Sequence, residues 1–191
     1  MPNKRKLSKQ ERRHYYEQML RRYSKQRQRN AAALPGCQQM IFVLDHLKAG
    51  FNVAKIFRSG ESFGVHEIHL IDIPPFDPAP SKGAFRKVPA RFHEHFDDCY
   101  QELIGRGYQI FTLEPGCSTT LNATELPEKS AFVMGHEERG ISFDRSQYDI
   151  QCLSISQFGQ TESLNVSIAA SIVMYEYSRQ FRRTLPPHRM C

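Results

Sequence analysis

The sequence lacks the features that mark membrane, secreted and disulfide-rich proteins. No run of about 18 apolar residues is present, which is the length a helix needs to cross a bilayer. The charged N-terminal segment is not followed by an apolar stretch, so we expect no secretory signal. The five cysteines are odd in number, widely spaced and without a Cys-x-x-Cys pair, which argues against a disulfide framework or a zinc site. We therefore predict reduced cysteines in a cytoplasmic protein.

Several common active-site signatures are also missing. The sequence has no Gly-x-x-x-x-Gly-Lys phosphate loop and no Gly-x-Gly-x-x-Gly turn. Ser163 does not lie in the Gly-x-Ser-x-Gly setting of a hydrolase elbow. His93 and His95 are two residues apart, a spacing that does not put both on one face of a helix. Since no third ligand is evident beside them, the sequence predicts no metal site.

The charge is concentrated at the N-terminus. The 191 residues carry a formal net charge of +6, with 40% apolar residues, enough for one globular domain with an appendage. Residues 1–30 hold eleven Lys or Arg against two Glu, a formal charge of +9, so the remainder carries −3. Such a basic arm is typical of nucleic-acid binding.

The basic arm has aromatic residues between its cations. Tyr15, Tyr16 and Tyr23 suit stacking on bases while the cations contact phosphates. The alternative is a solvated helix whose tyrosines, with Met19 and Leu20, dock it on the core.

Apolar runs alternate with helical stretches after this arm. The pattern predicts an α/β fold with a mostly parallel sheet and helices on both faces. We expect a basic, largely helical extension and linker over 1–36, a domain over 37–185 and a tail over 186–191. The predicted helices are 8–30, 52–62, 91–105 and 163–183, and the predicted strands are 40–44, 68–73, 108–113, 131–134 and 150–155.

The first of three motifs runs from residue 52 to residue 65. Asn52 is a good helix cap, and Arg58 follows six residues later among apolar neighbours. We expect Arg58 to be partly covered there and to bind an anion, although an ordinary surface arginine is the alternative. Gly64 permits a tight exit into the next strand.

The second motif, residues 132–142, is a buried strand that runs into a glycine-bounded loop. Gly135 and Gly140 let the backbone approach a ligand closely. Glu137 then lies at the carboxyl end of a strand, where open α/β sheets bind ligands. The alternative is a plain turn with exposed charges.

The third motif, residues 153–170, is a strand that ends in a polar loop before a long helix. Ser163 is a plausible cap of this helix, and Asn165 follows it. Taken alone, the motif also fits an ordinary capped core helix.

The order and spacing of the three motifs point to a family. Asn-x5-Arg-x5-Gly, Gly-x-Glu-x-x-Gly and Ile-x7-Ser-Leu-Asn-Val together resemble the SpoU-type (TrmH-like) RNA ribose 2′-O-methyltransferases of the SPOUT superfamily. The resemblance covers roughly residues 40–180. It implies a sheet whose C-terminal part is tied in a deep trefoil knot, with S-adenosylmethionine held in the loops of the knot. It also implies a homodimer with the 163–183 helix at the interface and an RNA site, for tRNA or rRNA, shared between subunits.

The resemblance also assigns site residues by position. The catalytic set is Arg58, Asn52, Glu137, Ser163 and Asn165. The residues expected to contact the cofactor are Leu113, Gly135, Gly140, Ile155, Ser163 and Leu164.

The sequence departs from the family pattern at two places. Val53-Ala54 stands where the family usually has Pro-Gly, and Ser156-Gln157 follows Ile155 where Pro-Met is usual. Because serine does not fix φ as proline does, the second change bears on the affinity for the methyl donor. Two other functions therefore stay open: a non-catalytic RNA-binding or ribosome-assembly protein on the same scaffold, and a different α/β nucleotide-binding enzyme whose motifs match by accident.

Overall fold

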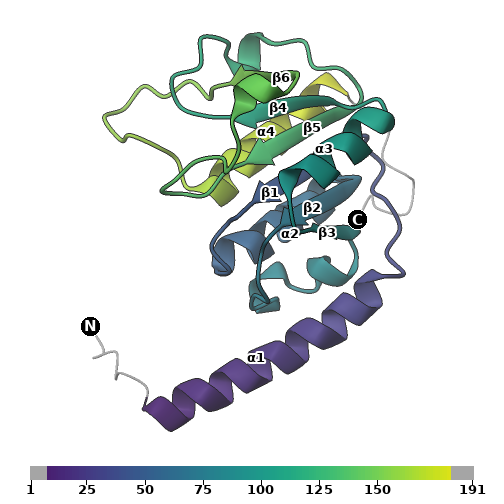
Figure 1. Cartoon of the computed structure of the whole chain (residues 1–191), viewed down its shortest axis with the longest axis vertical. Coiled ribbons are helices and arrows are strands. Elements are labelled where there is room, and N and C mark those ends of the chain that lie inside the picture. The colour runs from purple at the N-terminus through teal and green to yellow at the C-terminus, as the bar shows by residue number, and fades with distance from the viewer. Residues whose placement is uncertain (1–7, 182–191) are drawn as a thin grey trace.

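A six-stranded parallel sheet forms the centre of the molecule (Figure 1). The structure is a computed structural model that describes residues 8–181. Neighbouring strands follow the order β3-β2-β1-β5-β4-β6, and every pair is parallel, which confirms the predicted sheet. The strands are β1 (Ile41–Asp45), β2 (Glu67–Ile71), β3 (Ala90–His93), β4 (Gln109–Leu113), β5 (Ser130–Met134) and β6 (Ile150–Leu153).

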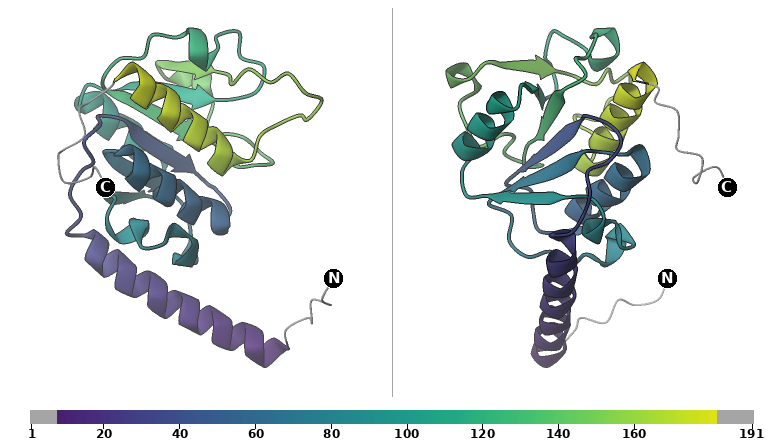
Figure 2. Two further views of the ribbon diagram at one scale, coloured as in Figure 1. Left: turned by 180° about the vertical axis from the view of Figure 1, so that it is seen from behind. Right: turned by 90° about the vertical axis from the view of Figure 1, so that its right-hand side faces the viewer.

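Helices cover both faces of the sheet, as the sequence predicts. The helices are α1 (Lys9–Asn30), α2 (Phe51–Phe63), α3 (Phe96–Gly105) and α4 (Val166–Gln180). The right-hand view of Figure 2 shows α3 on one side of the sheet and α2 with α4 on the other. Successive side chains of β1 alternate between the two cores: Phe42 joins the core under α2 and α4, and Val43 joins the core under α3.

Three element boundaries differ from the predictions. The predicted helix 91–105 contains most of β3 and only then α3. Strand β3 is a four-residue edge strand in which core-packed Ala90 and Phe92 alternate with Arg91 and His93, a pattern too short to mark a strand. Gly50 caps α2, so Asn52 lies inside the helix and is not its cap. Asn165 caps α4 in place of Ser163. The end of the predicted helix 163–183, the tail and Cys191 lie outside the described residues.

The described part of the basic arm forms one long helix, α1, that packs against the domain. Ser8 and Glu11 form a reciprocal capping box at its start. Met19 and Tyr23 are buried, and the Tyr23 ring lies 5.6 Å from that of Phe85. The expectation that Tyr23 stacks on bases is therefore wrong, since its ring belongs to the core; Tyr15 and Tyr16 remain exposed.

Asn30 fastens the end of α1 to the domain. Its side-chain amide donates to the carbonyls of Phe85 (2.5 Å) and Val88 (2.7 Å), and its oxygen accepts from the amide of Ala90 (3.0 Å). We expect Asn30→Ala to lower the free energy of unfolding by about 1–3 kcal/mol, because two buried carbonyls and one partly buried amide lose their partner. Denaturant unfolding beside Gln28→Ala, an exposed position on the same turn, measures the effect. Equal stability of the two variants would contradict this role.

Two of the five cysteines are not reduced, contrary to the prediction. Cys117, after β4, and Cys152, in β6, form a disulfide, so the prediction of five reduced cysteines is wrong for this pair. Sequence spacing does not reveal the pair because 35 positions separate the two residues. Cys37 is free and exposed, and Cys99 is free and buried, which raises the pKa of its thiol. Within residues 8–181, every helix is too short or too polar to cross a bilayer.

Candidate functional site

A pocket of about 230 Å³ lies beyond the carboxyl ends of β4, β5 and β6. Its walls come from the loops after these three strands, including the long loop before α4 that protrudes at the left of Figure 1. Open parallel sheets bind ligands at this edge. All six residues predicted to contact a cofactor line the pocket: Leu113, Gly135, Gly140, Ile155, Ser163 and Leu164.

The second motif forms a tight loop at the pocket wall. His136 and Gly140 exchange backbone hydrogen bonds of 2.7 and 2.9 Å, so the loop folds back on itself. A Cβ atom on Gly135 would lie 2.5 Å from the carbonyl carbon of Gly140, and Gly140 has a φ of +72°. Both glycines are therefore required by the backbone path of this loop.

One hydrogen-bonded chain joins the three motifs. The Asn52 amide donates to Glu137 Oε1 at 2.8 Å, and the Asn165 amide donates to Asn52 Oδ1 at 3.3 Å. The Asn165 oxygen also caps α4 by accepting from the Ser167 amide at 3.0 Å. Asn52 is available for this contact because Gly50 holds the cap position of α2. Residues that are 85 and 113 positions apart in the chain are thereby held at one edge of the pocket.

The structure places Arg58 away from these hydrogen-bonded residues. Its side chain is exposed, so the expectation that apolar neighbours partly cover it is wrong. Six residues of α-helix place it about 9 Å along the axis from Asn52, and it does not line the pocket. Ser59 Oγ, beside it, lies 2.8 Å from Ser171 Oγ, so Arg58 is next to the contact between α2 and α4.

Acidic side chains surround the mouth of the pocket. Glu114, Glu137 and Glu138 all line it. A hydrogen bond from Lys48 to Glu138, 2.6 Å long, lowers the pKa of that carboxyl. Arg145 pairs with Glu114 at 2.8 Å. Glu137, held by Asn52, is therefore the one of these three carboxylates without a basic partner within residues 8–181. Apolar walls with one such carboxylate suit a ligand that carries an apolar ring and a positive charge.

Comparison with known proteins identifies the family. The model of the SpoU rRNA Methylase family matches residues 39–175. The chain belongs to this family. The resemblance drawn from the three motifs is confirmed at that level.

The SpoU family relatives include longer proteins. An uncharacterized tRNA/rRNA methyltransferase of Mycobacterium tuberculosis is 29% identical over 162 residues, which are 82% of this chain and 50% of that protein. A similar protein of Mycobacterium avium is 29% identical over 148 residues, 75% of this chain and 48% of that protein. The chain spans about half the length of the curated relatives it matches.

Solved structures share the SpoU fold. The TrmH/SpoU tRNA modifying enzyme of A. aeolicus superposes with a TM-score of 0.69 and 20% identity over 83% of each chain. The AdoMet-bound rRNA methyltransferase of Sinorhizobium meliloti gives a TM-score of 0.68 and 20% identity over 79% of this chain and 59% of that one. A putative RNA methyltransferase of the TrmH family from Porphyromonas gingivalis gives 0.67 and 26% identity over 78% and 63% of the two chains.

Sequence reasoning missed one residue that shapes this SpoU site. Asp45 is fully buried at the end of β1, and its carboxylate accepts from the Ser142 amide (2.6 Å) and the Ser142 hydroxyl (2.8 Å). It therefore ties the end of the second-motif loop to the neighbouring strand. A lone aspartate directly after the apolar run 40–44 was the available signal.

Proposed function

We propose that this chain is an S-adenosylmethionine-dependent methyltransferase that acts on a ribose 2′-hydroxyl of tRNA or rRNA. The family match supports RNA methylation, and the names of the relatives agree with it. The observation that carries the proposal is the chain of contacts from Asn165 through Asn52 to Glu137, because it brings all three motifs to the edge of one pocket.

The pocket fits S-adenosylmethionine in its chemistry. Leu113, Ile155 and Leu164 offer apolar walls for the adenine, and the backbone around Gly135 offers polar groups. The Glu137 carboxylate favours the positive sulfonium, which supplies an activated methyl group when the cofactor is bound. A deep trefoil knot formed by these loops stays a prediction from the family resemblance.

Several polar residues at the edge of the pocket are assigned to positioning the reacting groups. Asn52 fixes the orientation of the Glu137 carboxylate, and Asn165 fixes Asn52. We assign Ser163, in the pocket wall, to the same positioning set. Holding the reacting groups in place supplies on the order of 7–11 kcal/mol in favourable intramolecular reactions.

Arg58 is assigned to the ribose and its neighbouring phosphate. The hydroxyl has to lose its proton as the new bond forms, but a guanidinium with a pKa above about 12 is a poor base. Its fork of donors can instead grip a phosphate and orient the sugar. We therefore propose that Arg58 positions the RNA and stabilises developing charge.

We further propose a homodimer in which Arg58 of the partner subunit completes each pocket. The neighbouring helices α2 and α4 carry large exposed apolar side chains: Phe51 is 61% exposed, Ile168 53% and Tyr175 62%. Ile168 and Tyr175 are seven residues apart and share one face of α4. Arg58 is exposed one helical turn from Lys55 on the α2 side of this surface. Arg58 does not line the pocket of its own chain, so we propose that burial of this surface in a dimer brings it to the pocket of the partner subunit.

The basic arm is proposed to bind RNA outside the pocket. Lys25 and Arg29 of α1 line a groove together with Arg86 of the domain. Deletion of residues 1–30 should weaken RNA binding and flatten its salt dependence, but it also removes buried Met19 and Tyr23. Charge removal is therefore the sharper test.

We expect the triple variant Lys25→Gln, Arg29→Gln, Arg86→Gln to bind RNA more weakly, because fewer phosphates are neutralised. For each phosphate contact that is lost, the plot of log affinity against log salt concentration should become shallower by about 0.7–0.9. Fluorescence anisotropy over a salt series measures both the affinity and the slope. Lys129→Gln, on an exposed lysine away from the groove, is the control. An unchanged slope in the triple variant would show that the groove does not contact RNA.

The proposed activity is tested by mass spectrometry of nucleosides from cellular RNA with and without the protein. We expect one 2′-O-methylated nucleoside to depend on it and to be restored by the purified protein with S-adenosylmethionine. A base-methylated nucleoside would overturn the ribose assignment. Failure to bind S-adenosylmethionine in calorimetry would favour the non-catalytic RNA-binding alternative, which the altered residues after Ile155 leave open.

A further inference from the structure

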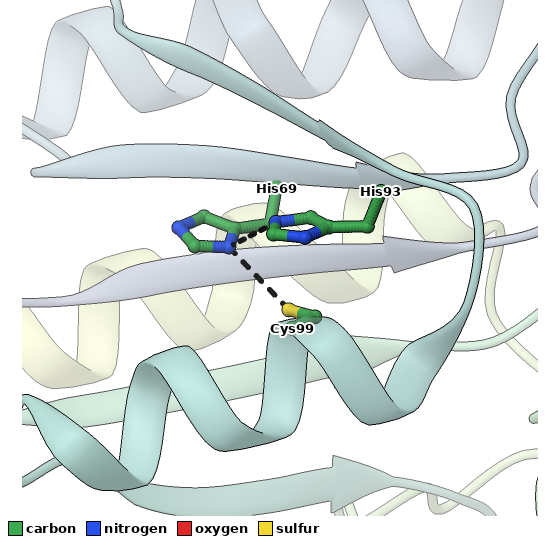
Figure 3. Close-up of side chains that lie close together, drawn as sticks. All are labelled: His69, His93 and Cys99. Atoms are coloured by element: carbon green, nitrogen blue, oxygen red, sulfur yellow. Dashed lines mark hydrogen bonds between the residues drawn. The ribbon is translucent and has the colours of Figure 1, made fainter.

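Two histidines and a cysteine meet on the face of the sheet that α3 covers (Figure 3). His69 comes from β2, His93 from the edge strand β3 and Cys99 from α3. His69 Nδ1 lies 3.0 Å from His93 Nε2 and 3.4 Å from Cys99 Sγ. All three ligand atoms lie within 4.8 Å of one another. The cluster contributes nothing to the pocket, which is lined by the loops after β4, β5 and β6.

The spacing of these atoms is close to that of a metal coordination sphere. Zinc binds imidazole nitrogen at about 2.0–2.1 Å and thiolate sulfur at about 2.3 Å, with tetrahedral geometry. Ligand atoms in such a site are then about 3.3 Å apart for two nitrogens and about 3.6 Å apart for nitrogen and sulfur. The observed 3.0 and 3.4 Å, both measured from His69 Nδ1, are about 0.3 and 0.2 Å shorter than these spacings, and the distance from His93 Nε2 to Cys99 Sγ is at most 4.8 Å.

A second observation points to a metal. The other ring nitrogen of His69, Nε2, lies 3.2 Å from the carboxylate of Glu67. Glu67 is itself held by Arg91 at 2.6 Å and by Arg106 at 2.9 Å. A carboxylate on the far nitrogen fixes the histidine tautomer and leaves Nδ1 with a free lone pair, which is the arrangement found behind metal-ligating histidines.

We propose that His69, His93 and Cys99 bind one zinc-type transition-metal ion. Two imidazoles and a thiolate select such an ion over calcium or magnesium, which prefer oxygen. His93 is partly exposed at the sheet edge, so solvent can reach the site and fill a fourth position. The ion would join β2, β3 and α3 and so link the edge strand to the helix that covers it. The sequence does not predict this site because 24 positions separate His69 from His93 and 6 separate His93 from Cys99. The closely spaced pair in the sequence is His93 with His95.

The alternative is a cluster held by hydrogen bonds alone, with His93 and Cys99 both donating to His69 Nδ1. Cobalt(II) distinguishes the two, since a cobalt–thiolate bond gives a charge-transfer absorption that hydrogen bonds do not. The experiment uses the full chain with Cys37→Ser and Cys191→Ser, purified without reductant so that Cys117 and Cys152 stay paired. Cys99 is then the remaining free thiol, and a thiol titration in denaturant checks that count.

The proposal expects one equivalent of cobalt to produce the absorption, zinc to displace it, and the melting temperature to rise with bound metal. Cys99→Ser should abolish the absorption. His93→Gln should weaken metal binding at least about tenfold, whereas exposed His95→Gln should bind as the parent does. No absorption in the parent, its survival in Cys99→Ser, or equal affinity of the two histidine variants would overturn the proposal. If Cys99→Ser does not fold, the difference in metal affinity between His93→Gln and His95→Gln still tests the proposal.

Discussion

We expect Arg58→Ala to slow methyl transfer strongly and to leave the affinity for S-adenosylmethionine unchanged. The side chain is exposed and does not line the pocket, so its removal takes away no contact to the cofactor. Loss of a group that orients a substrate and stabilises charge costs about 10²–10³ in kcat. Methyl incorporation into RNA measures the first quantity, and calorimetry with S-adenosylmethionine measures the second.

Arg58→Lys should fail as well. A lysine keeps the charge but presents a single point, which cannot reproduce a two-pronged grip on phosphate. Lys55→Ala, one turn earlier on the same exposed side of α2, is the matched control and should retain activity. Methylation at the wild-type rate by Arg58→Ala would remove Arg58 from the mechanism.

A mixing experiment tests whether Arg58 acts on the pocket of the partner subunit. One chain carries Arg58→Ala and the other carries Gly135→Ala, each inactive alone. If each site combines an arginine from one subunit with a pocket from the other, a mixed dimer has one site with both defects and one site with none. Random mixing in a symmetric dimer then restores about a quarter of wild-type activity. If both groups come from one chain, mixing restores nothing.

Gly135→Ala should abolish cofactor binding. Its added Cβ would lie 2.5 Å from the Gly140 carbonyl carbon and 2.6 Å from the Ile141 nitrogen, and both are backbone atoms that cannot yield without opening the loop. Since this loop forms a wall of the pocket, we expect the affinity for S-adenosylmethionine to fall by at least about a hundredfold, or about 2.7 kcal/mol.

The matched control for this substitution is Gly159→Ala. A Cβ there meets no atom within 4 Å, although the residue belongs to the loop before α4 that also borders the pocket. Calorimetry should find its affinity within a few-fold of the wild type. Tight binding by Gly135→Ala would show that the loop does not hold the cofactor.

The sequence predicted the fold best where burial is uniform. The runs 40–44 and 131–134 correspond to β1 and β5, which are buried on both faces and therefore consist of continuous apolar residues. Strand β3 was missed because it lies at the sheet edge, where Arg91 can extend to Glu67 and solvent. Ala90 and Phe92 of this strand pack against the core and alternate with Arg91 and His93, but four residues make too short an alternation to stand out before a helix.

The sequence predicted which residues form the candidate site, but it did not predict how these residues contact one another. The family resemblance selected six residues that all line the pocket. It did not predict that Asn52 would contact Glu137, because this depends on Gly50, and not Asn52, capping α2. Nor did it predict that Arg58 would lie outside its own pocket, since the rotation of α2 against the sheet follows from packing that one motif does not contain.

The docking of α1 has a consequence for the size of the RNA. A helix of 22 residues is about 33 Å long, and Asn30, Tyr23 and Met19 fix it to the domain. Its cations therefore stand at set distances from the pocket, unlike those of a flexible tail. If the proposed RNA binding is correct, short oligonucleotides would reach the pocket or the helix but not both, and the protein would select RNA by its dimensions.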